Sequence, residues 1–265
     1  MTHVIETTAD ETFFDDVPGA VTPGLIKRSA VLAYGILAYN VGVAGLIWLI
    51  LALGGLAPVG LSNWQAGTAS TGLLINLGLV GLFGLQHSVM ARPVFKRWLG
   101  CFMPKATERA TYMMASGIVT MTAIYFWQSL PGSVWQIESA LAQLALWTVF
   151  ALAWSYLFIA TFVTNHFELM GLRQVYLYFV NKRHTTLPFT RRFMYRYSRH
   201  PMMLGVLVGL WSVPAMSVSH FVMSALFTLY VFIGVFFEER GLVMEFGETY
   251  RKYKKEIGMF FPKIY

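Results

Sequence analysis

Charged side chains are scarce in this sequence. Asp, Glu, Lys and Arg make up 12% of the 265 residues, and hydrophobic residues make up 56%. Soluble domains usually carry about 25% charged residues, so this composition excludes an ordinary soluble protein. A membrane-spanning helix needs about 20 apolar residues, and six stretches offer that length: 29–56, 71–91, 110–130, 139–164, 201–218 and 219–237. We therefore expect an all-α, polytopic transmembrane helical bundle with about six spans.

The last two apolar stretches are poorly separated. Between them lie only Pro214 and the polar residues Ser217, Ser219 and His220. A proline breaks a helix interior, but a bent hairpin would also accommodate so short an interruption. Five spans plus a bent hairpin are therefore the alternative to six separate spans.

Basic side chains are absent from the two connections that would face outward, 57–70 and 131–138. With both termini inside, all 20 Lys and Arg residues fall on the inner segments. Lys and Arg near span ends favour the cytoplasmic side, so we expect a cytoplasmic basic face that carries both termini. Anionic lipid headgroups beside that face account for the net charge of +7. No nucleic-acid-binding motif accompanies the charge, so nucleic acid is not an expected partner.

Features of several other protein classes are missing. The acidic stretch 1–24 has no basic region followed by an apolar run, so it is not a cleavable signal peptide. We expect a flexible tail there and one membrane domain at 25–265. The spans hold almost no charged residue and the chain has no internal repeat, which disfavours a proton-coupled transporter. A single cysteine, Cys101, excludes an intrachain disulfide and argues against a zinc site of the usual composition.

Ionisable residues gather instead at the predicted cytoplasmic ends of the spans. Three clusters stand there: LQHSVMARP at 85–93, TNHFELMGLRQVY at 164–176, and RYSRHPMMLG at 196–205 together with FEERGLVMEFGETYRKYKKEIGMFFP at 237–262. Because all three lie on one side of the membrane, they can converge. We therefore expect the chemistry of the protein at this face.

The third cluster has the features of an anion site at a helix start. Pro201 suits the first turn of a helix, because its missing N–H would have no partner there, and His200 then falls near the N-cap. The amides of Met202, Met203 and Leu204 would be unpaired within the helix. Such amides favour a carboxylate or a phosphate as ligand.

Further residues of this cluster could complete a ligand site. Arg196 and Arg199 can add charged donors to the same anion, and Gly205 lets a ligand or another helix come close. Glu238 and Glu239 could hold an ammonium group or ribose hydroxyls, so an amino acid joined to a nucleoside would match both ends. The alternative is a positive-inside pattern next to a solvated helix end.

The third cluster also resembles a known signature. The combination of RHPMMLG, EER and FGETYRKYKKEIGMFFP resembles the C-terminal S-adenosylmethionine-binding signature of the isoprenylcysteine carboxyl methyltransferase superfamily of integral membrane methyltransferases. The segments LQHSVMARPVFKRW, ERATYMMAS and NHFELMGLRQVYL are similar to those of bacterial methanethiol S-methyltransferases, which make dimethyl sulfide. The chain departs from the superfamily signature at Met203, where tyrosine is usual, and at Ile257 and Gly258, where Val-Pro is usual.

The resemblance implies a methyltransferase of a bacterial cytoplasmic membrane that takes a small volatile thiol as substrate. S-adenosylmethionine would bind within residues 196–262. The residues implied to border this cofactor are Arg199, His200, Pro201, Leu204 and Gly205. Glu238 and Glu239 would hold its polar end, and Tyr250, Tyr253 and Lys254 would close over it.

Methyl transfer to sulfur needs a thiolate, and a cysteine-like thiol has a pKa of about 8.5. Histidine is the natural acceptor for that proton near neutral pH. His166 is our first candidate for the general base, with Glu168 or a nearby carbonyl fixing its tautomer, and His87 is the second. Arg173, with Gln174, could orient the loop or stabilise the thiolate, whereas we assign His184 and His220 no role.

Two other functions fit the same residues. A methyltransferase that acts on a prenylcysteine carboxylate, a phospholipid amine or another small thiol would share the cofactor cluster. A non-catalytic or transport protein of the same architecture would not bind S-adenosylmethionine.

Overall fold

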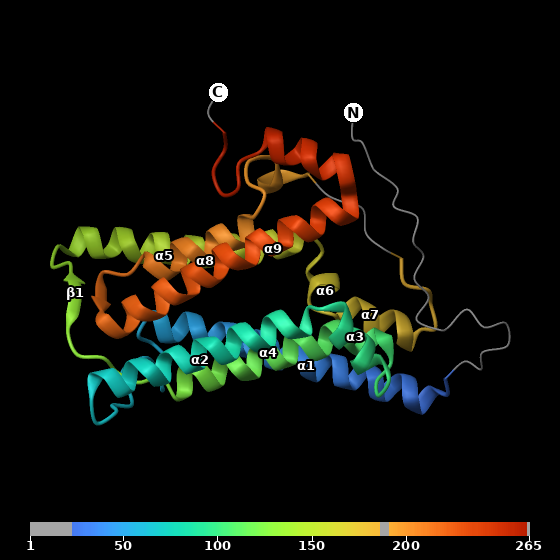
Figure 1. Cartoon of the computed structure of the whole chain (residues 1–265), viewed down its shortest axis with the longest axis horizontal. Coiled ribbons are helices and arrows are strands. Elements are labelled where there is room, and N and C mark those ends of the chain that lie inside the picture. Colours follow the sequence, from blue (N-terminus) through green and yellow to red (C-terminus); the bar gives the residue numbers. More distant parts are fainter. Residues whose placement is uncertain (1–22, 186–190, 264–265) are drawn as a thin grey trace. The chain divides into compact units, whose positions relative to one another are not determined.

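The computed structural model describes residues 23–185 and 191–263, and these residues are predominantly helical. The helices are α1 Leu25–Leu53, α2 Ala69–Met90, α3 Pro93–Gly100, α4 Glu108–Tyr125, α5 Ala140–Val163, α6 His166–Leu169, α7 Leu172–Phe179, α8 Pro201–Trp211 and α9 Val218–Glu256. Two 3-10 turns, η1 Lys105–Thr107 and η2 Phe193–Arg196, and two short strands, β1 Ser133–Gln136 and β2 Ala215–Ser217, complete the order (Figure 1). The predicted helical membrane protein is confirmed. Most of the acidic tail expected at 1–24 lies outside the described residues.

Four helices, α1, α2, α5 and α9, are long and apolar enough to cross a membrane. The third predicted stretch forms α4, which has 18 residues and begins with a charged Glu-Arg pair. The fifth forms α8, whose 11 residues extend over about 16 Å at 1.5 Å per residue. That length is about half of a bilayer core, so α8 is much shorter than the stretch predicted at 201–218.

The last two helices are separate, and the chain between them is not helical. Pro214 has no N–H to donate and disfavours helix in the residue before it, which accounts for the end of α8 at Trp211. The chain then forms β2, which pairs antiparallel with β1. The indole of Trp135 on β1 donates to the carbonyl of Val213 at 3.0 Å. This two-stranded sheet was not expected, and it pairs backbone groups that the helices leave exposed.

The chain divides into two compact units. The first comprises Met1–Trp48, Leu82–Thr122 and Thr164–Thr190, and the second comprises Leu49–Gly81, Ala123–Val163 and Arg191–Tyr265.

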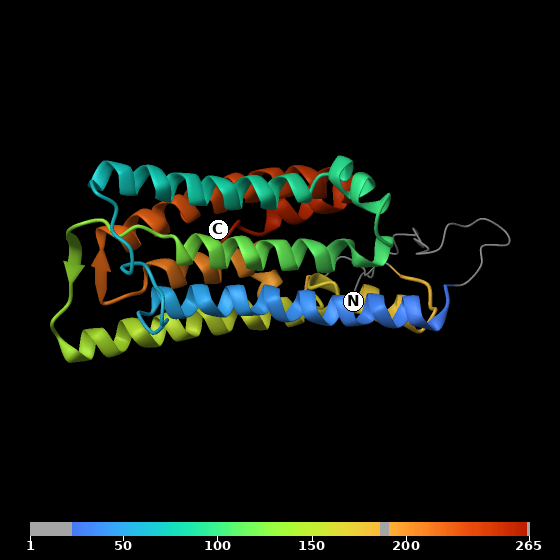
Figure 2. The same cartoon turned by 90° about the horizontal axis from the view of Figure 1, so that it is seen from below.

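In the first unit, close backbone contact joins α1 to α4 (Figure 2). A Cβ atom placed on Gly117 of α4 would lie 2.5 Å from the carbonyl oxygen of Val41 and 2.7 Å from the Cα of Gly42 on α1. Small residues let helices approach this closely in membranes, where packing rather than water exclusion drives association. The contact therefore depends on glycine at position 117.

In the second unit, α8 packs along α5 and beside α9 (Figure 1). A Cβ atom on Gly205 of α8 would lie 2.8 Å from the carbonyl oxygen of Ala153, and one on Gly209 would meet the Trp154 ring at 2.7 Å. Helix α5 is therefore the neighbour that Gly205 admits. On its other side, α8 contributes Met203 and Leu204 to an apolar cluster built around α9.

Helix α9 bends sharply at Gly247, where φ is 55° and ψ is −129°. This backbone conformation is accessible to glycine and strained for other residues. After the bend, the last turns of α9 run back toward the segment that contains η2 (Figure 1). The bend thereby returns the FGETYRKYKKE segment to the start of α8.

We predict that Gly117→Ala lowers the midpoint of thermal unfolding in detergent, because the added methyl would overlap the backbone of α1. Gly78→Ala is the matched control, since a Cβ atom at this helical position in α2 has no neighbour within 4 Å. Alanine favours helix over glycine by about 1 kcal/mol, so the control should unfold at the same temperature or higher. Equal midpoints for the two variants would contradict the close α1–α4 contact.

Candidate functional site

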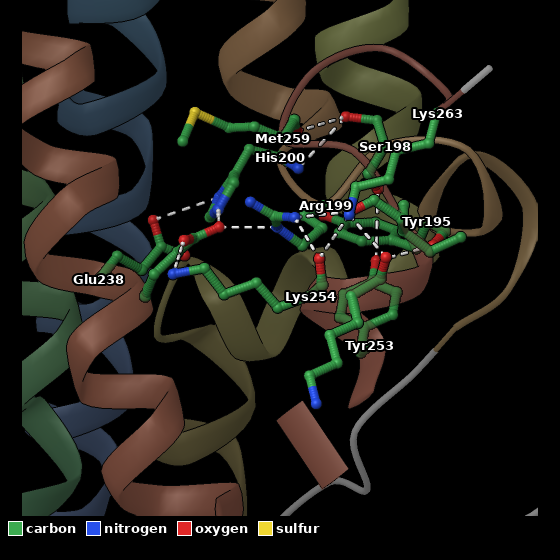
Figure 3. A network of polar contacts seen from close by, with 12 residues as sticks. Tyr195, Ser198, Arg199, His200, Glu238, Tyr253, Lys254, Met259 and Lys263 are labelled. Carbon is green, nitrogen blue, oxygen red and sulfur yellow. Dashed lines mark hydrogen bonds and ion pairs between the residues drawn. The ribbon is translucent and has the colours of Figure 1, made fainter. Parts of the chain in front are cut away.

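A buried carboxylate, Glu239 of α9, is the centre of a polar network in the second unit; its partners Arg199, His200 and Lys254 are labelled in Figure 3. Its Oε1 atom lies 2.7 Å from Nε of Arg199 and 3.2 Å from Nε2 of His200, and its Oε2 atom lies 2.7 Å from Nζ of Lys254. The side chains of Glu239 and Arg199 are only 4% and 6% exposed. A buried carboxylate needs charged partners of this kind to remain ionised. The network thus joins the start of α8 to both halves of α9.

Backbone pairing holds Arg199 and His200 in place. Their N–H groups donate to the carbonyls of Gly258 and Met259, each at 3.1 Å. The Arg199 guanidinium also donates from Nη1 to the carbonyls of Lys254 at 3.0 Å and Ile257 at 2.5 Å. We expected Arg199 to serve a ligand anion. In the structure, its Nε and Nη1 atoms donate to acceptors within the protein, and these bonds fasten the C-terminal turn to the start of α8.

The adjacent carboxylate, Glu238, has a different environment. Its side chain is 47% exposed, and its Oε2 atom lies 3.7 Å from Nδ1 of His200, beyond hydrogen-bond distance. The two carboxylates therefore have different surroundings, and their shared role toward a ligand stays a prediction. Glu239 is surrounded by protein donors, whereas the half-exposed side chain of Glu238 lies at the edge of the network (Figure 3).

The start of α8 is as predicted in outline. His200 is the N-cap and Pro201 opens the helix. The expectation that the Leu204 amide is unpaired was wrong, because this amide donates to the carbonyl of His200 at 3.0 Å, the first regular bond of the helix. The amides of Met202 and Met203 are the ones that stand in the first turn without an intrahelical acceptor.

The aromatic residues of the C-terminal segment pack inward. Tyr250 and Tyr253 are both buried, and the Tyr253 hydroxyl donates to the carbonyl of Tyr195 at 2.7 Å. The guanidinium of Arg191 lies over the Tyr253 ring, 4.8 Å from its centre. The end of α9 therefore closes over the η2 segment, at whose end Arg196 is exposed.

A second carboxylate cluster, in the first unit, surrounds Glu168 of α6. Its Oε2 atom accepts from Nη1 of Arg173 at 2.6 Å, and its Oε1 atom lies 2.8 Å from both Nε2 of Gln174 and Nε2 of His184. Arg173 also donates to the hydroxyl and the carbonyl of Thr185. The cluster ties the segment after α7 back to α6. His184, to which we assigned no role from the sequence, is thus a member of the Glu168 cluster.

His166 opens α6 and is buried. Its Nε2 atom lies 3.0 Å from the hydroxyl of Tyr39 on α1, and burial lowers the pKa of His166 below its ordinary value of 6.5. We expected Glu168 to orient this ring. Tyr39 instead provides the observed hydrogen bond at Nε2, because the Glu168 carboxylate is engaged by three other side chains.

His87, near the end of α2, also lies in the first unit. Its Nδ1 atom is 3.2 Å from the hydroxyl of Ser116 on α4. Its ring stacks on Phe83, with centres 5.2 Å apart, and contacts Tyr112 at 4.7 Å. Through its contacts with Ser116 and Tyr112, His87 joins α2 to α4.

Sequence reasoning missed Tyr39 and His184. Tyr39 is 127 residues from its partner His166 in the chain, and no local motif marks it. His184 could have been noticed as a lone histidine among the basic residues that follow α7. Across residues 23–185 and 191–263, no group of three or more His, Cys, Asp and Glu side chains is placed to hold a metal ion.

Comparison with known proteins finds relatives along most of the chain. The methanethiol S-methyltransferase of Crocosphaera subtropica is 36% identical over 240 residues, which cover 90% of this chain and 94% of the relative. That of Pseudomonas deceptionensis is 36% identical over 248 residues, 93% of this chain and 95% of the relative. Nurim of Sus scrofa is 27% identical over 80% of this chain and 87% of the relative. No protein-family model and no solved structure matches.

We predict that Glu239→Ala destabilises the protein strongly, because it leaves the Arg199 guanidinium buried without its counter-charge. Breaking a buried ion pair in this way costs about 3–5 kcal/mol. The measurement is denaturant unfolding of the purified protein in detergent. Glu238→Ala, a change of the same type at the neighbouring and half-exposed position, should alter the free energy of unfolding little. Similar losses for both variants would show that Glu239 is not the structural centre of the network.

Proposed function

The chain belongs to the family of methanethiol S-methyltransferases, and from this premise we propose that it transfers the methyl group of S-adenosylmethionine to methanethiol. The products are dimethyl sulfide and S-adenosylhomocysteine. The observation that carries the proposal is 36% identity over 240 residues, which leaves little of either chain unmatched. Similarity of this extent argues for shared chemistry and not only for a shared helical scaffold.

The second unit has groups that suit the amino-acid end of S-adenosylmethionine. The amides of Met202 and Met203, at the N-terminus of α8, can donate to a carboxylate. The accessible carboxylate of Glu238 can accept from an ammonium group or from ribose hydroxyls. Glu239 and Arg199 hold these groups in position through the network around them. The expected cofactor residues thus separate into ligand-facing and supporting ones.

Lys254 belongs both to the ligand-facing residues and to the supporting residues. Its ammonium pairs with Oε2 of Glu239 at 2.7 Å, yet its side chain is nearly half exposed. A lysine on a flexible stem can rotate toward a ligand carboxylate while a fixed arginine cannot. Lys254 therefore supports the frame and can also close over the ligand, as the family signature implies.

When bound, S-adenosylmethionine supplies a methyl group carried on a positively charged sulfur. The acceptor sulfur must attack as a thiolate, and only a small fraction of a free thiol is ionised at pH 7. We propose that His166 takes the thiol proton. In the tautomer whose Nε2–H donates to Tyr39, the basic nitrogen is Nδ1. Arg173 and Glu168 position the segment that contains His166, and His87 is the second candidate base.

The same proposal includes the setting of the reaction. We infer that the protein lies in a bacterial cytoplasmic membrane, with both termini and the site on the cytoplasmic side. The basic residues lie at the span ends that face the cytoplasm in this orientation. The residues from 25 onward would form one membrane-embedded methyltransferase domain behind an acidic tail at 1–24. Membrane lipids and a small volatile thiol would be its partners.

Detergent-purified protein should bind S-adenosylmethionine in calorimetry and should release dimethyl sulfide, detected in the headspace, when methanethiol is added. Glu238→Gln should weaken cofactor binding by about tenfold or more, because it removes one charge-assisted contact of about 1.5–3 kcal/mol. The free energy of unfolding should be unchanged in this variant.

Glu248→Gln is the control for the charge change, since Glu248 is an exposed residue of the same helix. It should bind S-adenosylmethionine like the unaltered protein. If another thiol, a phospholipid amine or a prenylcysteine were methylated but methanethiol were not, the proposed substrate would be wrong. The proposed cofactor would be unaffected by that result. Absence of cofactor binding would overturn the proposal altogether.

His166→Ala should abolish turnover with cofactor binding kept, since the thiol proton would lose its acceptor. Because burial holds the pKa of His166 below 6.5, the basic, neutral form predominates at pH 7. The rate should therefore fall only as the pH drops through that lowered pKa, and any residual rate of the variant should lack this acid limb. Comparable activity and an identical pH profile in the variant would remove His166 from the mechanism and leave His87 to be examined by His87→Ala.

A further inference from the structure

The short helix α3 exposes an apolar ridge. No residue of α3 is buried, and Val94, Trp98 and Phe102, which follows the helix, are 69%, 55% and 72% exposed. The Trp98 ring contacts Phe95 and Phe102, each with centres 5.3 Å apart. In water, a contiguous patch of this kind marks an interaction site.

The ridge continues an exposed apolar stripe of α2. Leu82, Leu85 and Val89 are all exposed and recur at helical spacing. Helix α2 is long and apolar enough to cross a membrane, so this stripe contacts lipid chains. Only Ala91 and Arg92 separate α2 from α3, so the two helix ends lie at most about 11 Å apart. The ridge therefore starts at the edge of the bilayer.

Basic residues lie beside and opposite the ridge. At about 100° per residue, Lys96 is about 160° around the helix from both Val94 and Trp98, and Arg97 lies on the flank, about 60° from Val94 and about 100° from Trp98. The segment from Arg92 to Arg109 contains five basic residues and one acidic residue, Glu108, which pairs with Lys96 at 2.8 Å. An excess of positive charge next to an apolar ridge is typical of a helix that lies in the plane of a membrane surface.

We propose that α3 lies in the headgroup layer of the membrane and binds anionic phospholipid. The ridge of Val94, Trp98 and Phe102 enters the boundary between headgroups and acyl chains, where indole rings are favoured. Lys96 and Arg97 meet the phosphate groups. Charge complementarity and continuity with the stripe of α2 favour lipid over a second copy of this chain as the occupant.

The test uses Cys101, the one cysteine of the sequence, which is exposed and follows α3 directly. An environment-sensitive fluorophore is attached to Cys101 of the full-length protein. The protein is reconstituted in nanodiscs of phosphatidylcholine, with or without phosphatidylglycerol. The label should be quenched by lipid that carries a spin label just below the headgroup and should be shielded from aqueous iodide, more strongly when phosphatidylglycerol is present.

Two variants separate the two halves of the proposal. Trp98→Gln should more than double iodide quenching in both membranes, because the ridge loses its anchor. The double variant with Lys96→Gln and Arg97→Gln should keep the shielding but lose its dependence on phosphatidylglycerol. Arg251→Gln with Lys252→Gln, an equal loss of exposed charge elsewhere, is the control and should retain that dependence.

Other results would overturn the proposal. Full access of iodide to the label in both membranes would place α3 in water. Shielding that appears in detergent and rises with protein concentration would identify a second copy of the chain as the occupant. Shielding without any effect of phosphatidylglycerol would refute the binding of anionic lipid.

Discussion

One constraint on this structure is the cost of burying a carboxylate. Glu239 lies near the middle of α9 with almost no exposure, and an unpaired charge there would be far too costly for a marginally stable fold. Arg199, His200 and Lys254 come from the start of α8 and the far side of the Gly247 bend to neutralise it. The position of the C-terminal segment therefore follows from the need to satisfy one acid.

This constraint also separates the roles of two neighbouring residues. Because Glu239 and Arg199 are used by the protein, the groups that remain for a ligand are the Glu238 carboxylate and the first-turn amides of α8. A buried ion network that supports an accessible charge is a common way to hold a binding group in a fixed position. Under the proposed function, the RHP and EER motifs would thus combine structural and ligand-facing roles within a few residues.

The membrane setting explains the remaining contacts. Lipid offers the helices no hydrophobic driving force for association, so close contacts at small residues hold them together, such as Gly117 of α4 against α1 and Gly205 of α8 against α5. Glu168 of α6 and Glu239 of α9 each collect cationic partners. In the first unit, the Glu168 cluster ties the segment after α7 to α6, next to His166.

The helical membrane class can be inferred from the residues alone, because apolar length and the scarcity of charge suffice for that inference. The start of α8 can be inferred in the same way, since His200 and Pro201 act locally through the first turn. Which acid is buried depends on contacts between segments that are far apart in the chain. Glu238 and Glu239 are adjacent in the chain, and their difference arises from Arg199, 40 residues earlier, and from the turn that returns Lys254. In the same way, Tyr39 reaches His166 from 127 residues away in the chain, and the linear order of residues has no signal for that contact.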